Sequence, residues 1–526
     1  MNAFRVITVA AFVGSACRLV AQADTAAQGD RVEVLNADRW DFNKDVATGA
    51  QRLSGHVRFR QGAAVMACDS AWLFDDQRVN AFGHVILGQG DTLRITGDKL
   101  FFSGRDHVAR MEGHVVLSDP GLELTTDALT YDVRARKADY TSGARITDRR
   151  EGNTLSSMHG SYFTGAHTFV FSGNVRLEHP DRTILADTLQ YSSLSGTAYF
   201  LGPTHILQGT TTMYCERGSY NTRSGFGRFT QAGRISSGAQ ELTGDSLHYN
   251  RSTGEGTGWG HVAIKDTVNR MVVRGNFGTH RQDRGNSMVT GQAELVMMMG
   301  KDSLHLHADT LFARQDSAAH RHLAARRHVR FFKDDMQGVC DTMTYNGADS
   351  VIALRGQPFI WSKGNQLSGD TVFIHMHDGR AEKLMVDGAA LMVEQVDSSR
   401  FNQVAGTTLT GYFHGDEIKQ LVAEGNSRTI YFAREKKDGA ERITGVNRAD
   451  CSRITVGLDS GKVNTVSFIT QPDGTMYPVD KAPPEALQFE NFLWNAAERP
   501  LDKGDIFREP TDDARVPEQA SGAPIR

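Results

Sequence analysis

Two short stretches, ITGDKLFF at residues 95–102 and GHVVL at residues 113–117, decide the fold of this chain because both recur along most of its length. The first has the pattern apolar-x-small-Asp-x-apolar-x-aromatic. Its copies are centred on Asp38, Asp69, Asp98, Asp127, Asp187, Asp245, Asp309, Asp341 and Asp370, with degenerate copies at Met158, Glu216, Asn276 and Thr407. The step between copies is about 29 residues, and such a fixed period is the signature of a repeat architecture.

The second pattern, Gly-His/Asn-Val-x-apolar, alternates with the first. Both patterns place apolar residues at every second position, which predicts β-strands. In the first pattern the apolar set slips by one, from Leu93 and Ile95 to Leu100 and Phe102. A β-bulge at the small-Asp pair would absorb this slip, since a bulge inserts one unpaired residue. Each repeat is therefore predicted to be a hairpin of two bulged or bent antiparallel strands.

The composition agrees with a β architecture and excludes some classes of function. The chain has 526 residues with 53 glycines and 12 prolines, and its formal net charge is −4. A nucleic-acid-binding protein would carry a basic excess, so nucleic acid is not an expected partner. Abundant glycine with little proline suits strands punctuated by tight turns and bulges.

The N-terminus has the layout of a secretory signal peptide. A mostly apolar run, residues 6–16, precedes the small-x-small site Ala21-Gln22-Ala23, which predicts removal of residues 1–23 and a mature chain that starts at Asp24. A lipoprotein signal with acylation at Cys17 is the alternative. No later stretch reaches the roughly 18 apolar residues that a membrane span needs. We therefore expect the mature chain to be exported and to have no transmembrane helix.

The repeated polar residues favour a structural role over a chemical one. The aspartate position of the repeat supplies only one carboxylate per repeat, and in some copies another residue replaces the aspartate. Calcium-binding β-rolls, in contrast, use several carboxylates per site. The sequence has no Gly-x-Ser-x-Gly elbow, His-Glu-x-x-His pair or phosphate-binding loop, so we expect no enzyme, no metal site and no cofactor. Cys68, Cys215 and Cys340 occupy the small position before the acidic residue, which favours a buried role, and their pairing with each other or with Cys451 stays open.

The apolar positions that recur in both patterns allow two interpretations: they form a closed sandwich core, or they line a groove for an apolar ligand. An open stack with one apolar face must cover that face or expose it. The candidates for lining such a groove are Val57, Phe59, Val85, Leu87, Leu100, Phe102, Val115, Leu117, Leu129, Tyr131, Val175, Leu177, Leu189, Tyr191, Leu247, Tyr249, Val262 and Ile264.

The C-terminal part differs in composition. Residues 414–478 keep strand character and are predicted to be the terminal β module of the same stack. Residues 479–510 are rich in proline, and Pro483-Pro484 predicts the start of a short helix with apolar residues Leu487, Phe489, Phe492, Leu493 and Ala496. We expect this helix to cap the open sheet edge, with a docking segment as the alternative. The composition of residues 511–526 predicts disorder.

The repeats resemble those of the OstA-like or LptA-like periplasmic lipopolysaccharide-transport bridge family, whose relatives include the N-terminal domain of the outer-membrane assembly protein LptD. The resemblance rests on motifs such as Gly173-Asn174-Val175 and Ala186-Asp187-Thr188-Leu189-Gln190-Tyr191, and it covers about residues 32–477. Its length is that of the longer form found in Bacteroidetes-type bacteria. The resemblance implies an extended, V-shaped β-jelly-roll of about a dozen repeats over residues 31–413, with a hydrophobic groove for acyl chains.

From this resemblance we expect a non-enzymatic bridge that carries lipopolysaccharide or lipooligosaccharide to the outer membrane. Its implied partners are the lipid A acyl chains, an inner-membrane transporter complex and an LptD-like outer-membrane protein, joined by strand-edge stacking, with self-association as a further option. The alternative function is that of a parallel β-helix adhesin or polysaccharide-processing protein. Strand direction separates the two, because the alternating hairpin-like units favour antiparallel pairing.

Overall fold

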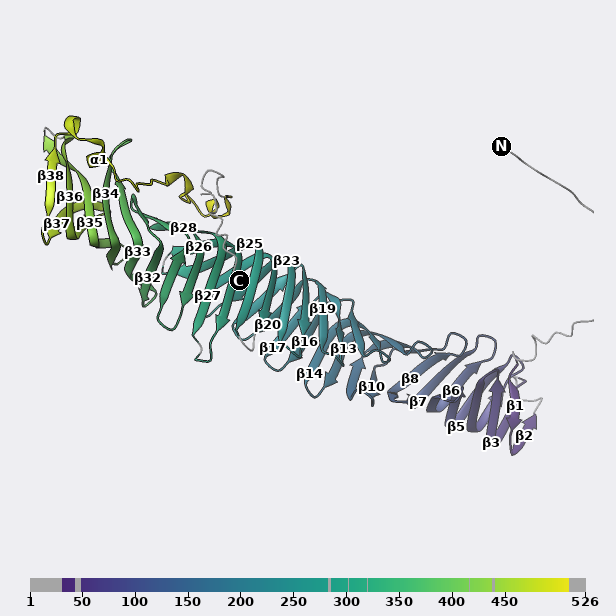
Figure 1. Cartoon of the computed structure of the whole chain (residues 1–526). Coiled ribbons are helices and arrows are strands. Elements are labelled where there is room, and N and C mark those ends of the chain that lie inside the picture. Colours follow the sequence, from purple (N-terminus) through teal and green to yellow (C-terminus); the bar gives the residue numbers. More distant parts are fainter. Residues whose placement is uncertain are drawn as a thin grey trace, which may run out of the picture. The chain divides into compact units, whose positions relative to one another are not determined.

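The computed structural model describes residues 31–42, 49–281, 285–300, 302–318, 320–415, 417–437 and 440–509, and these form 38 strands with a few short helices (Figure 1). The predicted signal peptide and the predicted disordered tail lie outside the described residues. The chain divides into two compact units, residues 1–174 and 175–526. No described helix is long and apolar enough to cross a membrane.

The first unit holds β1 to β12 and the first half of β13. Its strands are β1 (Glu33–Asn36), β2 (Arg39–Phe42), β3 (Gln51–Gln61), β4 (Ala64–Leu73), β5 (Arg78–Gln89), β6 (Leu93–Ser103), β7 (Val108–Asp119), β8 (Leu122–Asp132), β9 (Lys137–Tyr140), β10 (Ala144–Asp148), β11 (Asn153–Ser157), β12 (His159–Phe163) and β13 (Thr168–His179).

The second unit holds the remaining elements. Its strands to residue 346 are β14 (Arg182–Ser192), β15 (Thr197–Phe200), β16 (Thr204–Gln208), β17 (Thr211–Cys215), β18 (Arg217–Asn221), β19 (Phe226–Gln231), β20 (Gly233–Ser237), β21 (Gln240–Gly244), β22 (Ser246–Asn250), β23 (Glu255–Asp266), β24 (Met271–Arg281), β25 (Asn286–Met299), β26 (Asp302–Gln315), β27 (Arg321–Lys333) and β28 (Met336–Asn346). After these come β29 (Val351–Arg355), β30 (Phe359–Ser362), β31 (Asn365–Ser368), β32 (Thr371–His377), β33 (Arg380–Gln395), β34 (Phe401–His414), β35 (Glu417–Lys437), β36 (Ala440–Asp459), β37 (Lys462–Ile469), β38 (Asp473–Tyr477), η2 (Val479–Lys481), α1 (Pro484–Leu487), η3 (Ala496–Glu498) and η4 (Asp505–Phe507).

Every pairing whose register the structure describes is antiparallel, and most join strands that are close in sequence, as β5 joins β4 and β6. An all-β fold with a long antiparallel sheet of many strands is therefore confirmed. The parallel β-helix is wrong for the described strands, because its coils would stack parallel strands.

Each repeat bends at one corner, and the bend explains the slip of the apolar pattern. In β6, Asp98 and Lys99 both face outward, whereas Gly97 and Leu100 lie on the inner side. The register of β5 against β6 skips from Phe82–Lys99 to Val85–Gly97, so Gly83 and His84 are the extra residues. The bulge thus lies in the Gly-His strand, and the prediction that placed it at the small-Asp pair is wrong. The slip in β6 marks the corner itself, where two successive residues point to solvent.

Glycine is required at this corner for two reasons. Gly83 and His84 both have positive φ, +76° and +41°, in the left-handed region that favours glycine. A Cβ on Gly83 would also lie 2.4 Å from Asp69 Oδ2, so the carboxylate of the preceding Asp strand rests directly on the glycine. His84 Nδ1 lies 2.8 Å from the same oxygen. The recurring Asp, Gly and His residues therefore form one structural motif.

The corners divide each unit into two facing sheet layers. Arm A contains the strand halves that meet at turns such as 89–93, and arm B contains those that meet at turns such as 103–108. In several repeats the strand is interrupted at the corner, so that β15 lies in arm B and β16 in arm A, on either side of Pro203, which cannot donate to the ladder. The inner faces of both arms are apolar and buried against each other.

The chain end forms a strap, residues 482–509, over the outer face of arm A. Phe489 is 4% exposed and packs on Leu391, Val393 and Ile430, which point away from the interior. Helix α1 has only four residues and ends at Leu487, so four of the five predicted helix residues, Phe489, Phe492, Leu493 and Ala496, lie beyond it. The strap covers a sheet face, and the prediction of a helix that caps the sheet edge is wrong.

Buried polar side chains of arm A hold the strap. Gln403 donates from Nε2 to the carbonyl of Leu487 and accepts from the N–H of Phe489. Gln366 makes the same pair of bonds with Leu493 O and Asn495 N. Each glutamine thus satisfies one donor and one acceptor of a chain that has no strand partner there.

Candidate functional site

The interior between the arms is the candidate site, and it contains all eighteen residues predicted to line a groove. None of them is more than 6% exposed. They alternate along β3, β5 to β8, β13, β14, β22 and β23 with residues that face solvent, as the period of two predicts. Whether lipid reaches them stays a prediction.

The interior is packed in this part of the chain, because aromatic rings of arm B fill it. Phe169 stacks on Tyr162 at 4.0 Å and on Phe171 at 5.3 Å between ring centroids. Tyr131 and Tyr191 are equally buried. The hydroxyl of Tyr131 donates to Gln89 of arm A, so this group is satisfied within the protein. The expected apolar slot is therefore closed here.

A cavity of about 330 Å³ opens farther along the chain, where these rings are missing. Arm B contributes smaller or unbranched side chains at its inner positions, and arm A contributes a run of methionine and leucine. The lining includes Met271, Val273, Val289, Leu295, Met297, Met299, Leu304, Leu306, Leu311, Leu323, Ala325, Met343, Tyr345, Ile352 and Met376.

None of the eighteen predicted residues lines this cavity. The repeats around Asp309 and Asp341 belong to the predicted series, so the signal for these strands was present in the sequence. The Asp309 repeat lacks the terminal aromatic residue, because Phe312 is shifted by one place and Ala313 takes its position, whereas the Asp341 repeat keeps Tyr345, which lines the cavity. Whether the interior is packed or open depends on the inner side chains of both arms. The pattern within one strand does not show which side chains of the other arm lie opposite.

An ion pair lies at one end of the cavity. Arg321 Nη2 of arm B is 2.8 Å from Asp266 Oδ2 of arm A. Burial alone would raise the pKa of Asp266, but hydrogen bonds from Asn269, Gln240 and Arg321 outweigh it and hold the pKa at about 2. This carboxylate is therefore charged at any physiological pH.

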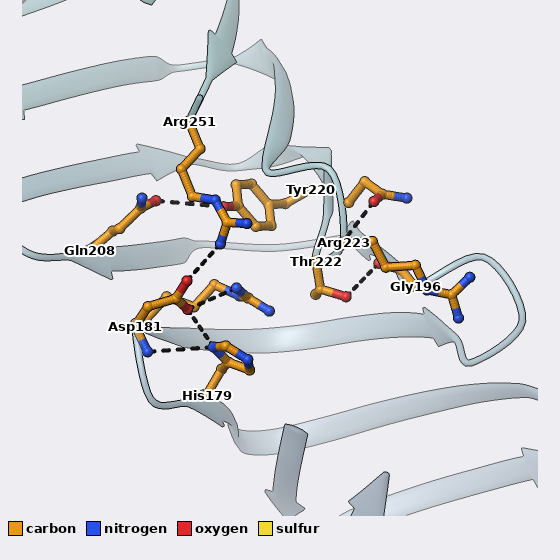
Figure 2. A network of polar contacts seen from close by, with 10 residues as sticks. His179, Asp181, Gly196, Gln208, Tyr220, Thr222, Arg223 and Arg251 are labelled. Carbon is orange, nitrogen blue, oxygen red and sulfur yellow. Dashed lines mark hydrogen bonds and ion pairs between the residues drawn. The ribbon is translucent and has the colours of Figure 1, made fainter. Parts of the chain in front are cut away.

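The same kind of contact joins the arms elsewhere along their open edges, opposite the corners. Asp181 in a turn of arm A accepts from Arg251 Nη1 of arm B at 2.6 Å, and it also contacts His179 and Arg182 (Figure 2). In the same view the hydroxyl of Tyr220 points to Gln208. We call such polar contacts between turns of opposite arms mouth contacts.

The corner repeats the same histidine–aspartate pair along the chain. The pairs His56–Asp38, His84–Asp69, His114–Asp98, His261–Asp245 and His328–Asp309 are separated by 2.8–2.9 Å and lie in solvent. The hydrogen bond with Asp69 and then its charge raise the pKa of His84 above its ordinary value. No group of three or more potential ligands that could hold a metal ion occurs among the described residues.

The described cysteines are free thiols. Cys68, Cys215 and Cys340 are buried, and burial raises the pKa of the Cys68 thiol to about 11 and those of Cys215 and Cys340 to about 12. Such thiols stay protonated and unreactive. They act as small apolar residues at the corner, as the repeat pattern indicated.

Comparisons with known proteins give matches to two family models and to a solved structure. The model of a family described as OstA-like protein matches residues 29–187 and 171–245, and the model described as LptA/(LptD N-terminal domain) LPS transport protein matches residues 275–380. No curated protein matches the sequence. Among solved structures, the crystal structure of LptH, the LptA-homologous periplasmic component of the lipopolysaccharide transport device from Pseudomonas aeruginosa, is 15% identical with a TM-score of 0.21, covering 27% of this chain and 95% of that chain.

Proposed function

We propose that this chain, which belongs to the OstA-like and LptA/LptD N-terminal family of lipopolysaccharide transport proteins, carries the acyl chains of lipopolysaccharide or lipooligosaccharide through the interior between its two arms. The observation that carries this proposal is the apolar cavity between the arms. Most of its lining falls within residues 275–380, the part of the chain that the lipopolysaccharide-transport model matches. The two bent layers also support the V-shaped jelly-roll that the family resemblance implies.

The proposed mechanism is shielding from water and involves no enzymatic step. An acyl chain that leaves water for the apolar interior gains about 0.8 kcal/mol for each CH₂ group that is buried. This gain is the same in both directions along the interior, so it gives no direction to transport. A motor in the inner membrane must supply the direction, which fits the Lpt components that the family implies as partners.

The ends of the sheet support a role as a bridge in the periplasm. In the described structure β1 and β2 pair only with β3, and β37 and β38 pair only with β36. Unpaired strand edges accept further strands. Trp40 and Phe42 on β2 are 54% and 60% exposed, which adds apolar surface to that edge. We propose that inner-membrane and outer-membrane partners, or a second copy, stack on these edges.

Binding of lipopolysaccharide to the purified chain without residues 1–23 tests the proposal. We expect saturable binding of lipopolysaccharide micelles and displacement of the bound lipid by free lipid A, since both present the same acyl chains. Delipidated O-polysaccharide of the same strain is the control and should not compete. Competition by the polysaccharide alone, or no binding by a folded protein, would contradict a lipid carrier and favour a polysaccharide-binding function.

A further inference from the structure

Methionine side chains from both arms meet at the cavity. Among the described residues that line it, arm A contributes Met271, Met297 and Met299, and arm B contributes Met343 and Met376. We call these five residues the cavity methionines. Met271 is 7% exposed, and the other four are half-buried, because the cavity lies in front of their side chains. The cluster lies within the second compact unit.

Other methionines of the chain provide two comparisons. Met66 and Met213 belong to the packed interior and are at most 1% exposed. Met298 and Met476 are 54% and 52% exposed. Oxidation of methionine by a small reagent in water follows exposure. Such a reagent should therefore reach Met298 readily, the cavity methionines through the cavity, and Met213 hardly at all.

The thioether of methionine is apolar, and hydrogen peroxide converts it to a polar sulfoxide. A lone pair of the sulfur attacks one peroxide oxygen, so that an S–O bond forms as the O–O bond breaks. The released hydroxide takes the proton of the transferred oxygen and leaves as water. The sulfur loses two electrons, and the peroxide gains them. A polar S–O group no longer suits a wall that contacts apolar ligands.

The surroundings of the cavity methionines show where this change would act. Met297 lies opposite Leu304 in the register of β25 and β26, so a sulfoxide there would interrupt an apolar wall. An acyl chain that packs on this wall would have to displace the water bound to the sulfoxide. At the charged end of the cavity, Arg321 Nη1 donates to Met271 Sδ at 3.1 Å, while its Nη2 makes the mouth contact with Asp266.

We propose that the cavity methionines are a reversible oxidation site that controls lipid binding. Peroxide makes the cavity wall polar and weakens the binding of acyl chains at least tenfold, and reduction of the sulfoxides restores it. Reduction by methionine sulfoxide reductases takes two thiols for each sulfoxide and yields a disulfide and water. The proposal rests on the proposed function. Flexible thioethers suit a cavity that adapts to acyl chains of different shape, and sensitivity to oxidants follows from their use.

The test treats the purified chain without residues 1–23 with hydrogen peroxide and follows the cavity with the apolar dye N-phenyl-1-naphthylamine. A Cys451→Ser background removes the described thiol that is not fully buried. Peptide mass spectrometry should find one added oxygen at Met297 and Met343 before Met213. The Kd for the dye should rise at least tenfold and should recover after treatment with both methionine sulfoxide reductases, one for each sulfoxide epimer, and dithiothreitol.

A variant and its control identify the residues responsible. The quadruple variant Met297→Leu/Met299→Leu/Met343→Leu/Met376→Leu keeps the apolar volume of the wall, so it should bind the dye as the wild type does and resist peroxide. Met298→Leu changes the outward neighbour on the same strand and should stay as sensitive as the wild type. Equal sensitivity of the quadruple variant and Met298→Leu would overturn the proposal. If the quadruple variant does not fold, oxidation and rescue of the wild type decide.

Two further measurements separate this proposal from general damage and from the carrier function. The β-sheet signal in circular dichroism should not change on oxidation, and its loss together with dye binding would overturn the proposal in favour of unfolding. Unchanged binding of dye and fluorescent lipid A by protein with sulfoxides at Met297 would also overturn it but would keep the carrier. Untreated protein that binds the dye but not lipid A would contradict the carrier, and the response of dye binding to peroxide would still decide the oxidation site.

Discussion

Replacing Met297 with aspartate is expected to weaken lipopolysaccharide binding by about 10–100-fold, since a buried polar group without a partner costs about 1–3 kcal/mol and each 1.4 kcal/mol is tenfold in affinity. Met297 lines the cavity and is only half-buried, because the cavity lies in front of it. The carboxylate can stay hydrated in the empty protein, so folding should tolerate the change. An acyl chain that enters must displace that water.

The neighbouring residue provides a matched control. Met298 is 54% exposed on the opposite face of the same strand, so Met298→Asp makes the same substitution one residue away. We expect it to leave lipid binding within about twofold, as for surface changes of less than 0.5 kcal/mol. Binding would be measured by titration with fluorescent lipid A. If both variants bind as the wild type does, the cavity is not the lipid site.

Replacing Glu498 with alanine is expected to destabilise the docked strap by about 3–5 kcal/mol, because it leaves a buried charge without its partner. Arg330 donates to Glu498 Oε2 and to Glu498 O, both at 2.7 Å, and the two side chains are 3% and 7% exposed. Hydrogen exchange of residues 482–509 should rise sharply in the variant. The strap should also become sensitive to limited proteolysis.

The control removes both charges together. Arg330→Met/Glu498→Leu should recover much of the lost protection, since an apolar pair of similar volume often replaces a buried ion pair at little cost. Glu112→Ala, which breaks an exposed ion pair with Arg110, should leave exchange in the strap unchanged. Protection in Glu498→Ala equal to that in Glu112→Ala would show that the ion pair does not hold the strap.

The repeat made most of the fold predictable, because its signals are local. The spacing of Asp98 and Asp127 gave the hairpin, and the slip between Ile95 and Leu100 gave the bend. The bulge was assigned to the wrong strand because the left-handed conformation of Gly113 and His114 depends on the carboxylate of Asp98 one strand away. The apolar periodicity of a single strand does not reveal the contacts that its residues make with a neighbouring strand.

The open cavity and the position of the strap could not be predicted from the sequence for a similar reason. The cavity exists because inner positions of both arms, such as Ala325 and Met297, are small or flexible at the same level of the stack. The strap depends on Gln366, Gln403 and Arg330, which contact residues between 84 and 168 positions later in the chain. The apolar residues Phe489 and Phe492 indicated burial in the sequence but not the face on which they would pack.

Photo-crosslinking in living cells tests the central claim most directly, since it asks whether lipopolysaccharide occupies the interior during growth. Val273 lines the cavity and its neighbour Arg274 faces solvent on the same strand, so each would carry a photo-reactive side chain in turn. A carrier predicts lipopolysaccharide adducts from Val273 and few from Arg274, with the same contrast between the buried Leu306 and the outward His305. Equal labelling from both faces, or none from the interior of a folded chain, would contradict it.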